Sequence, residues 1–266
     1  ELVHSQLRKV SDLEKSLRKM GLNLLQRNDF FSDTLSFEYV NKFLEIIIGD
    51  EKLNNRYDCL VYKPFVDFYE ESNRIFIFHN LTQFGGLERK ILKDGINIDV
   101  DNYDKMTEEY YGDIGLISRR LSQLLDGSEN SVKFDYDERN DWFFYCTNKR
   151  AITFKQRLIN LNSNSIHVKD KDGKTKYTFN SEDFTFKKKD GSSTIIQFDV
   201  CKDLSSKLIT IQDKIKELNK VEWELKISYL FNKYNVGLKS FYLFLAEIDS
   251  YCAGAKLSIR NGYSRP

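Results

Sequence analysis

The stretch DLSSKLITIQDKIKELNKVEWELKISYLFNKY, residues 203–234, decides the fold. Apolar residues recur along it at steps of three and four, with charged residues between them, so the sequence predicts one long amphipathic helix. At about 1.5 Å per residue such a helix is about 48 Å long, more than one compact core requires. We therefore expect it to leave the body of the protein as an arm. Its apolar stripe is predicted to be Leu204, Leu208, Ile211, Ile215 and Leu218, continued after a phase slip at Glu222 by Val221, Leu225 and Tyr229.

A second segment, residues 103–125, carries a matching stripe and is also predicted to be a long helix. The residues between the two helices, 130–201, lose this period and indicate strands. The fold class predicted for the chain is therefore mainly α with a β insertion, in which long antiparallel helices carry a small β-rich module at their tip. The second stripe consists of Met106, Tyr110, Ile114, Ile117, Leu121 and Leu124.

Within the insertion, residues 132–137 and 142–147 are predicted strands, because apolar and polar residues alternate there beside a polar turn. Residues 148–158 indicate a short helix with Ile152 and Leu158 on its apolar side. Two hairpins are expected next, each with an Asp-Gly pair at its centre. Type I′ turns favour this pair because both central residues need positive φ. The turns are Asp172-Gly173, between 166–171 and 174–179, and Asp190-Gly191, between 184–189 and 193–199.

The remaining segments are predicted to be mostly helical. Periodic apolar residues favour a first helix over residues 7–20 that stops at Gly21, and a second over 36–48. A helix over 236–257 is apolar on nearly every side, which predicts that it is buried. Residues 57–92 are assigned mainly to helix, with breaks at Pro64 and at Gly85-Gly86.

Composition excludes several classes of protein. Of the 266 residues 30% are charged and 41% hydrophobic, and the net charge of +1 provides no overall basic field for nucleic acid. The apolar run 241–246 is far shorter than the roughly 20 residues that cross a bilayer, so no membrane span is expected. The four cysteines contain no Cys-x-x-Cys pair, which argues against zinc and favours reduced thiols in an intracellular compartment. They are Cys59, Cys146, Cys201 and Cys252.

Motifs that carry chemistry are missing from the sequence. Its three histidines, His4, His79 and His167, lie far apart, and the chain has no phosphate loop, nucleophile elbow or His-Glu-x-x-His motif. We therefore predict no catalytic residue, no metal ligand and no cofactor for this chain. The acidic group Asp135, Asp137, Glu138 and Asp141 is compatible with a bound cation, but a solvated turn is the simpler interpretation.

One local signal points to a ligand. Residues 131–200 hold ten Lys and three Arg against eight Asp and two Glu, a net charge of +3. Lysines beside small hydroxyl residues with free backbone N–H groups suit phosphate oxygens, whereas forked side chains that read bases are not evident. A lysine run on an exposed hairpin also has a simpler explanation, which is that its charges keep an edge strand soluble and prevent it from pairing with other chains. The run consists of Lys187, Lys188 and Lys189, followed by Gly191, Ser192 and Ser193.

Three stretches together resemble the MutS family of DNA mismatch-repair proteins. LRKVSDLEKSLRKM (7–20) is similar to a helix of the family's lever region. FDYDERNDWFFYCTNKRA (134–151) resembles its clamp-opening strands, although Trp-Phe-Phe stands where the family usually has Gly-Tyr-Tyr. FLAEIDSYCAGAKLSIRNGYSRP (244–266) is similar to the passage into its ATPase domain. Their order and spacing span almost the whole chain.

The resemblance implies a domain organisation and a partner. Residues 1–129 and 202–266 would form the lever, and 130–201 a clamp that touches the backbone of double-stranded DNA without reading sequence. The parent protein would be a dimeric, DNA-dependent ATPase using ATP and magnesium, with its mismatch-reading module before Glu1 and its ATPase domain after Pro266. The clamp residues expected to contact DNA are Lys187, Lys188, Lys189, Ser192, Ser193, Lys149, Arg150 and Lys155.

Two other classes of function stay open on the sequence. The first is a helical-arm scaffold whose β-rich tip binds a protein partner. The second is an enzyme with an unrecognised site, which would require a clustered acid–base pair. Changing the hairpin lysines to Glu separates the first alternative from DNA binding, because a protein partner would remain bound.

Overall fold

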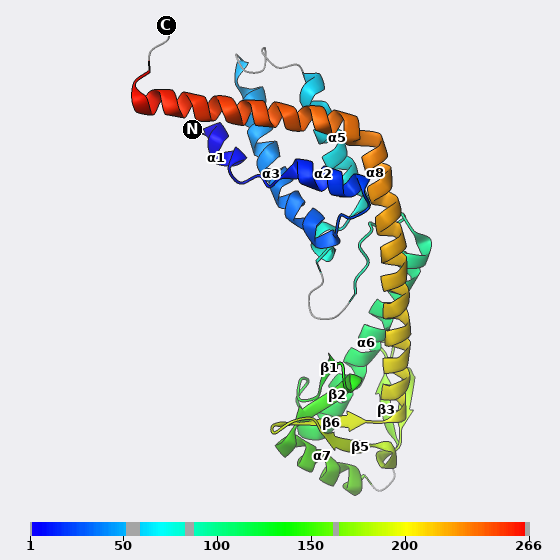
Figure 1. The fold of residues 1–266 in the computed structure, drawn as a ribbon. Coiled ribbons are helices and arrows are strands. Elements are labelled where there is room, and N and C mark those ends of the chain that lie inside the picture. The colour runs from blue at the N-terminus through cyan, green and yellow to red at the C-terminus, as the bar shows by residue number, and fades with distance from the viewer. Residues whose placement is uncertain (1, 52–58, 83–87, 162–164, 264–266) are drawn as a thin grey trace. The chain divides into compact units, whose positions relative to one another are not determined.

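The chain is mainly α-helical with a β insertion, as predicted (Figure 1). The structure is a computed structural model and describes residues 2–51, 59–82, 88–161 and 165–263. The chain divides into two compact units. The helical unit comprises Glu1–Gly85, Arg89–Ile98 and Glu217–Pro266, and the sheet unit comprises Gly86–Glu88 and Asp99–Lys216. The sheet unit thus contains more than the predicted 130–201 segment, because it also holds the helix before the strands and the beginning of the helix after them.

Among the residues that the structure describes, five helical segments precede the long helices. The single helix predicted over 7–20 is wrong, because the chain leaves helical geometry after Leu7. Asp12 then starts a new helix by accepting a hydrogen bond of 2.9 Å from the backbone N–H of Lys15. The segments are α1 (Leu2–Leu7), α2 (Leu13–Gly21), α3 (Arg27–Gly49), α5 (Cys59–Ile75) and the 3-10 turn η1 (Phe78–Asn80).

Aromatic rings fill the core of the helical unit, where α3, α5 and α8 (Asp199–Asn261) meet. Trp223 lies edge-on to Phe30 with ring centroids 5.7 Å apart, and its indole N–H donates to the carbonyl of Leu25 at 3.1 Å. Pro64 lies inside α5, so the predicted break there is wrong. At Gly237 a Cβ would come within 2.4 Å of the Pro64 side chain, so glycine permits this approach of α5 and α8. The predicted break at Gly85-Gly86 lies outside the described residues.

The apolar stripe of α8 changes register along its length. Leu204, Leu208, Ile211 and Ile215 are buried as predicted. The predicted continuation is wrong: Val221, Leu225 and Tyr229 are 50%, 58% and 44% exposed. The buried residues are instead Asn219, Trp223, Ile227 and Leu230.

The reason for this register lies in the side chains that α8 meets in the helical unit. The large indole of Trp223 occupies the aromatic core, and the amide of Asn219 bonds the backbone of Arg89 and Ile91. These two contacts fix which face of α8 turns inward.

The separate buried helix predicted over 236–257 does not exist. Helix α8 continues without interruption to Asn261. It also keeps an exposed face there, since Leu243 and Tyr251 are 72% and 51% exposed. Only the face with Leu238, Phe241 and Ile248 is buried.

In the sheet unit, α6 (Ile98–Asp126) and the first part of α8 pack together with one face of the strands. Ile114, Ile117 and Leu121 of α6 are buried in this core, as predicted. Two residues of the predicted stripe differ: Met106 is 39% exposed, and Leu125 is fully buried in place of Leu124. The other elements are β1 (Lys133–Asp137), β2 (Asp141–Thr147), α7 (Asn148–Asn160), β3 (Ile166–Lys169), β4 (Thr175–Phe179), η2 (Ser181–Asp183), β5 (Thr185–Lys188) and β6 (Ser193–Gln197).

The described strands form two antiparallel sheets. One has four strands in the order β1-β2-β6-β5, and β3 pairs with β4 alone. The hairpins are confirmed, but their type I′ turns are wrong, because Gly173 alone among the four central residues has positive φ. At the β5–β6 turn the carboxylate of Asp190 accepts from the backbone N–H groups of Ser192 and Ser193, both at 2.7 Å, and this stabilises a wider turn. Ile152 of α7, predicted on its apolar side, is 61% exposed.

Candidate nucleic-acid interface

The three consecutive lysines of the predicted site lie on two faces of the sheet. In the register Lys187 pairs with Ile195, whereas Lys188 pairs with Thr194. Neighbouring residues of a strand point to opposite faces, so Lys187 and Lys188 point apart. Helix α7 packs on the face of Lys188, where Phe186 lies 5.9 Å from the ring of Phe154.

Lys187 and Lys189 reach across the opposite face. The ammonium of Lys187 donates to Oδ1 of Asn140 at 3.0 Å, and that of Lys189 lies 3.6 Å from a carboxylate oxygen of Asp135. Strands β6 and β2 stand between β5 and β1 in the sheet order. These contacts therefore require a curved sheet whose β5 edge and β1–β2 turn come together over this face. The curvature accounts for the burial of Phe143 and Ile195, which are 2% and 0% exposed.

The charge of Lys189 is largely compensated within the protein. Its ammonium lies 4.5 Å and 4.9 Å from the ring centroids of Phe143 and Tyr145, and Asp137 is 4.0 Å away. Burial raises the pKa of Asp137, but hydrogen bonds from Asn140 and the charge of Lys189 outweigh it and lower that pKa. The carboxylates of Asp135 and Asp137 on β1 thus hold the ammonium group of Lys189 within the protein. In the described ranges no group of three His, Cys, Asp or Glu side chains is arranged to hold a metal ion.

Asn148, the first residue of α7, ties this helix to the β5–β6 turn. Its side-chain N–H donates to the carbonyl of Gly191 at 2.9 Å, and its Oδ1 accepts from the hydroxyl of Thr194 at 2.7 Å. Thr194 is in turn the register partner of Lys188. This bridge brings Lys149 to the same end of the sheet as Lys188. Both lysines are exposed, and within the described part of the chain neither forms an ion pair.

The serines of the turn use their polar groups internally. The backbone N–H groups of Ser192 and Ser193 donate to Asp190, as does the hydroxyl of Ser192 at 2.9 Å. The expectation of free N–H groups at this turn is therefore wrong. These hydrogen bonds, led by the one from the Ser192 backbone, lower the pKa of Asp190 and keep a negative charge beside the lysines.

The other two predicted cations hold α7 in place. Nε of Arg150 lies 3.2 Å from the carboxylate of Asp126, and the ammonium of Lys155 lies 5.0 Å from the ring centroid of Phe186. Hydrogen bonds from Ser131 and Ser128, together with the charge of Arg150, lower the pKa of Asp126 to about 2. The structure thus brings Lys149 and Lys188 together as exposed cations and gives the other predicted residues partners within the unit.

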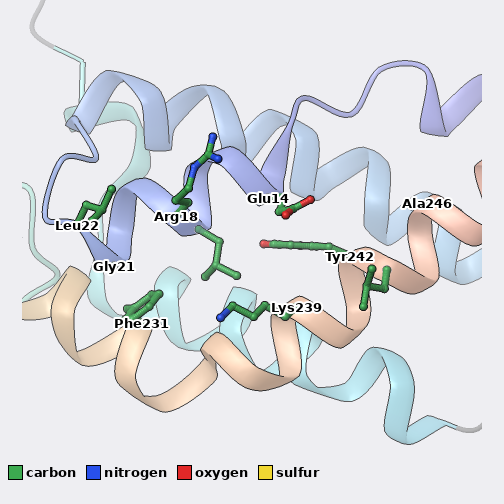
Figure 2. Close-up of a pocket in the computed structure, with 10 residues that line it drawn as sticks. Glu14, Arg18, Gly21, Leu22, Phe231, Lys239, Tyr242 and Ala246 are labelled. Atoms are coloured by element: carbon green, nitrogen blue, oxygen red, sulfur yellow. The ribbon is translucent and has the colours of Figure 1, made fainter.

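The helical unit contains a hollow of a different kind, between α2 and the C-terminal part of α8 (Figure 2). It has a volume of about 550 Å³ and a mostly apolar lining that includes Leu17, Phe231 and Leu243. The ring of Tyr242 lies across it, and burial raises the pKa of this phenol far above its usual range. None of the predicted site residues lies here, and no motif in the sequence indicates this hollow.

Comparisons with known proteins leave the resemblance to MutS as a prediction. No family model matches the chain, and no curated protein matches it. In the described part of the chain, no helix combines the length and apolar character needed to cross a membrane. Cys146, Cys201 and Cys252 are free thiols, and burial raises the pKa of Cys146 and of Cys201 to about 11.

Proposed function

We propose that this chain is the lever and clamp portion of a MutS-like mismatch-repair protein. In this proposal the sheet unit holds the backbone of double-stranded DNA without reading its sequence. The chain itself has no catalytic activity, and the ATP, the magnesium and the ATPase domain belong to other parts of a dimeric parent protein. The buried free thiols of Cys146 and Cys201 support a reducing, intracellular location.

The observation that carries the proposal is the bridge made by Asn148. It fixes the first turn of α7 against the β5–β6 turn, so Lys149 and Lys188 are held at one end of the sheet. Lysine ammonium groups attract phosphate oxygens as point charges and carry no base specificity. Two exposed lysines on a fixed support therefore favour contacts with the sugar–phosphate backbone.

The remaining predicted residues have a different role in the proposal. Lys189 is held by Asp135 and the aromatic rings, so we assign it to the shape of the sheet instead of to direct phosphate contact. Arg150 likewise anchors α7 through Asp126. Lys188 and Lys149 then provide the direct contacts. Lys187 donates to the neutral side chain of Asn140 on the opposite face of the sheet and keeps its net charge there.

Helix α8 supplies the basis for coupling. One uninterrupted helix contributes Leu204 and Leu208 to the core of the sheet unit and Trp223 and Leu230 to the core of the helical unit. We propose that changes at the C-terminal end of α8, driven by the ATPase domain of the parent, are transmitted along this helix as a rigid-body motion.

Titration of the full 266-residue chain with fluorescently labelled duplex at several salt concentrations tests DNA binding. If about four phosphates are neutralised, log K falls against log salt with a slope of about −3.6. The double variant Lys149→Glu with Lys188→Glu should lose most of the affinity. Its matched control, Lys105→Glu with Lys174→Glu, changes net charge equally at exposed positions elsewhere in the sheet unit. A flat salt response, or equal losses in both variants, would remove the DNA proposal.

A further inference from the structure

A second cationic surface lies in the sheet unit, in a groove between α6 and β3. Its volume is about 600 Å³, and its polar lining combines one face of α6 with the strand and the turn that follows it. None of these residues belongs to the site discussed above. The polar side chains are Arg119, Arg120 and Gln123 of α6, and His167, Lys169 and Lys171 of the β3 segment.

The charges in this groove are not balanced within the protein. One acidic residue, Asp170, lines it, and its Oδ1 accepts from the backbone N–H groups of Asp172 and Lys174, both at 2.9 Å. That carboxylate oxygen therefore stabilises the turn. Among the described residues Lys169 and Lys171 have no ion-pair partner. The groove thus differs from the face that holds Lys189, where carboxylates and aromatic rings surround the cation.

Arg120 adds an unsatisfied donor. Its Nε is buried and has no hydrogen-bond partner within the described part of the protein. Arg120 also lines the groove, and none of the described residues forms an ion pair with its guanidinium, so an anion in the groove meets an uncompensated positive charge there. The neighbouring Arg119 is exposed and lies 3.8 Å from Glu129, a weak surface pair. Guanidinium groups match the geometry of phosphate oxygens through paired N–H donors.

We propose that this groove binds phosphate groups, with Arg120 as the anchor and Lys169 and Lys171 as flanking charges. The phosphates come from a free polyphosphate or from the phosphodiester backbone of a nucleic acid, since both present the same oxygens. The inference goes beyond the function proposed above and shares no residue with the β5–β6 end of the sheet.

Calorimetric titration of the full chain with sodium tripolyphosphate at low salt tests the groove directly. We expect saturable binding that Lys171→Glu weakens by about tenfold, because one favourable charge becomes repulsive. Lys174→Glu, on the same turn but outside the groove, is the matched control and should retain affinity. Lys169→Glu and Arg120→Gln should each also weaken binding. Because Lys169 and Lys171 are exposed, their variants should fold normally, and thermal unfolding checks this.

Two results would overturn the proposal: no binding of tripolyphosphate by the wild-type chain, or equal losses in Lys171→Glu and Lys174→Glu. Competition with labelled duplex identifies the source of the phosphates. If tripolyphosphate displaces duplex and Lys171→Glu weakens both, the groove binds nucleic-acid backbone; if only tripolyphosphate binding is lost, it binds free phosphates. Lys149→Glu with Lys188→Glu should leave tripolyphosphate binding unchanged. Failure of duplex binding alone therefore contradicts the function proposed above and not the groove.

Discussion

Two carboxylates of the helical unit, Asp33 on α3 and Glu71 on α5, sit in opposite environments. Asp33 is 4% exposed, and its carboxylate accepts a hydrogen bond from the hydroxyl of Ser11 at 3.2 Å. Burial outweighs the hydrogen bonds from Ser16 and Ser11 and raises its pKa to about 6. Glu71 is also partly desolvated, but Lys233 at 2.6 Å and the hydroxyls of Tyr229 and Tyr234 outweigh that effect and lower its pKa to about 2. Hydrogen bonds from serine hydroxyls and the nearby charge of Lys19 do not compensate the burial of Asp33, whereas a hydrogen-bonded lysine with two phenols compensates that of Glu71.

The Glu71→Gln variant should show the largest effect. The folded pKa lies below the ordinary 4.5, so this carboxylate stabilises the fold above pH 4.5, and that contribution is lost as pH falls towards 2. The difference in pKa corresponds to at most about 3 kcal/mol, less whatever solvent screening removes. Denaturant unfolding between pH 2 and 7 measures it. The wild type should be more stable than the variant at pH 6 and lose this advantage near pH 2. Parallel pH profiles would contradict the assignment.

The Asp33→Asn variant should behave in the opposite way. An acid with a raised pKa binds its proton more tightly in the folded state, so its contribution to stability is lost as pH rises from 3.8 through about 6. Above pH 6 we expect the variant to be more stable than the wild type by at most about 3 kcal/mol, with the difference vanishing near pH 4. The same unfolding series is the measurement. A variant that is less stable at pH 8 would show that the carboxylate is adequately compensated.

The Gly237→Ala variant tests whether packing positions the Glu71 cluster. Pro64 on α5 meets Gly237 on α8, the same two helices that Glu71 and Lys233 connect. Overpacking typically costs about 1–3 kcal/mol, partly offset by the better helix propensity of Ala. We expect a net loss of about 1–2 kcal/mol and a smaller pH dependence between pH 2 and 5. Gly254→Ala, in the same helix with open space around it, is the matched control and should be neutral or stabilising. Equal melting temperatures for the two variants would exclude the packing argument.

The Tyr229→Phe variant should show the smallest effect. It removes one hydrogen bond of 2.6 Å to Glu71 and leaves Lys233 and Tyr234 in place. A hydrogen bond to a charged group at a half-exposed position contributes about 1 kcal/mol. We expect that loss above pH 5 and a smaller one near pH 2, where the carboxylate is about half protonated. A pH-independent loss would mean that ring packing, not the hydrogen bond, stabilises this contact.

The fold was predictable from the sequence where one rule applied throughout a segment. The step of three and four in residues 204–215 matches the buried face of α8, because a single core covers that segment. The same rule fails at Trp223, where the helix enters a different core and the indole determines the inward face. Chain breaks depend on single residues. The helix pattern over 7–20 did not reveal that Asp12 caps a new helix, and Pro64, predicted as a break, lies within α5.

The site was predictable only in part. The sequence identified the lysine run, but alternation alone does not show that Lys189 reaches Asp135, because that contact depends on the curvature of four strands. The groove between Arg120 and Lys169 was missed entirely. Its residues are far apart in the sequence and come from a helix and a strand, so no local pattern connects them.

The buried sulfur atoms of the sheet unit have a practical consequence. Cys146 and Cys201 are its two cysteines, and with a pKa of about 11 each is almost wholly protonated at neutral pH. Protonated, inaccessible thiols react slowly with maleimides and similar reagents. A cysteine introduced in place of the exposed Ser192 would therefore accept a fluorophore or spin label with little labelling of the native cysteines of this unit. Spectroscopy at the β5–β6 turn then requires no removal of the native cysteines from the sheet unit.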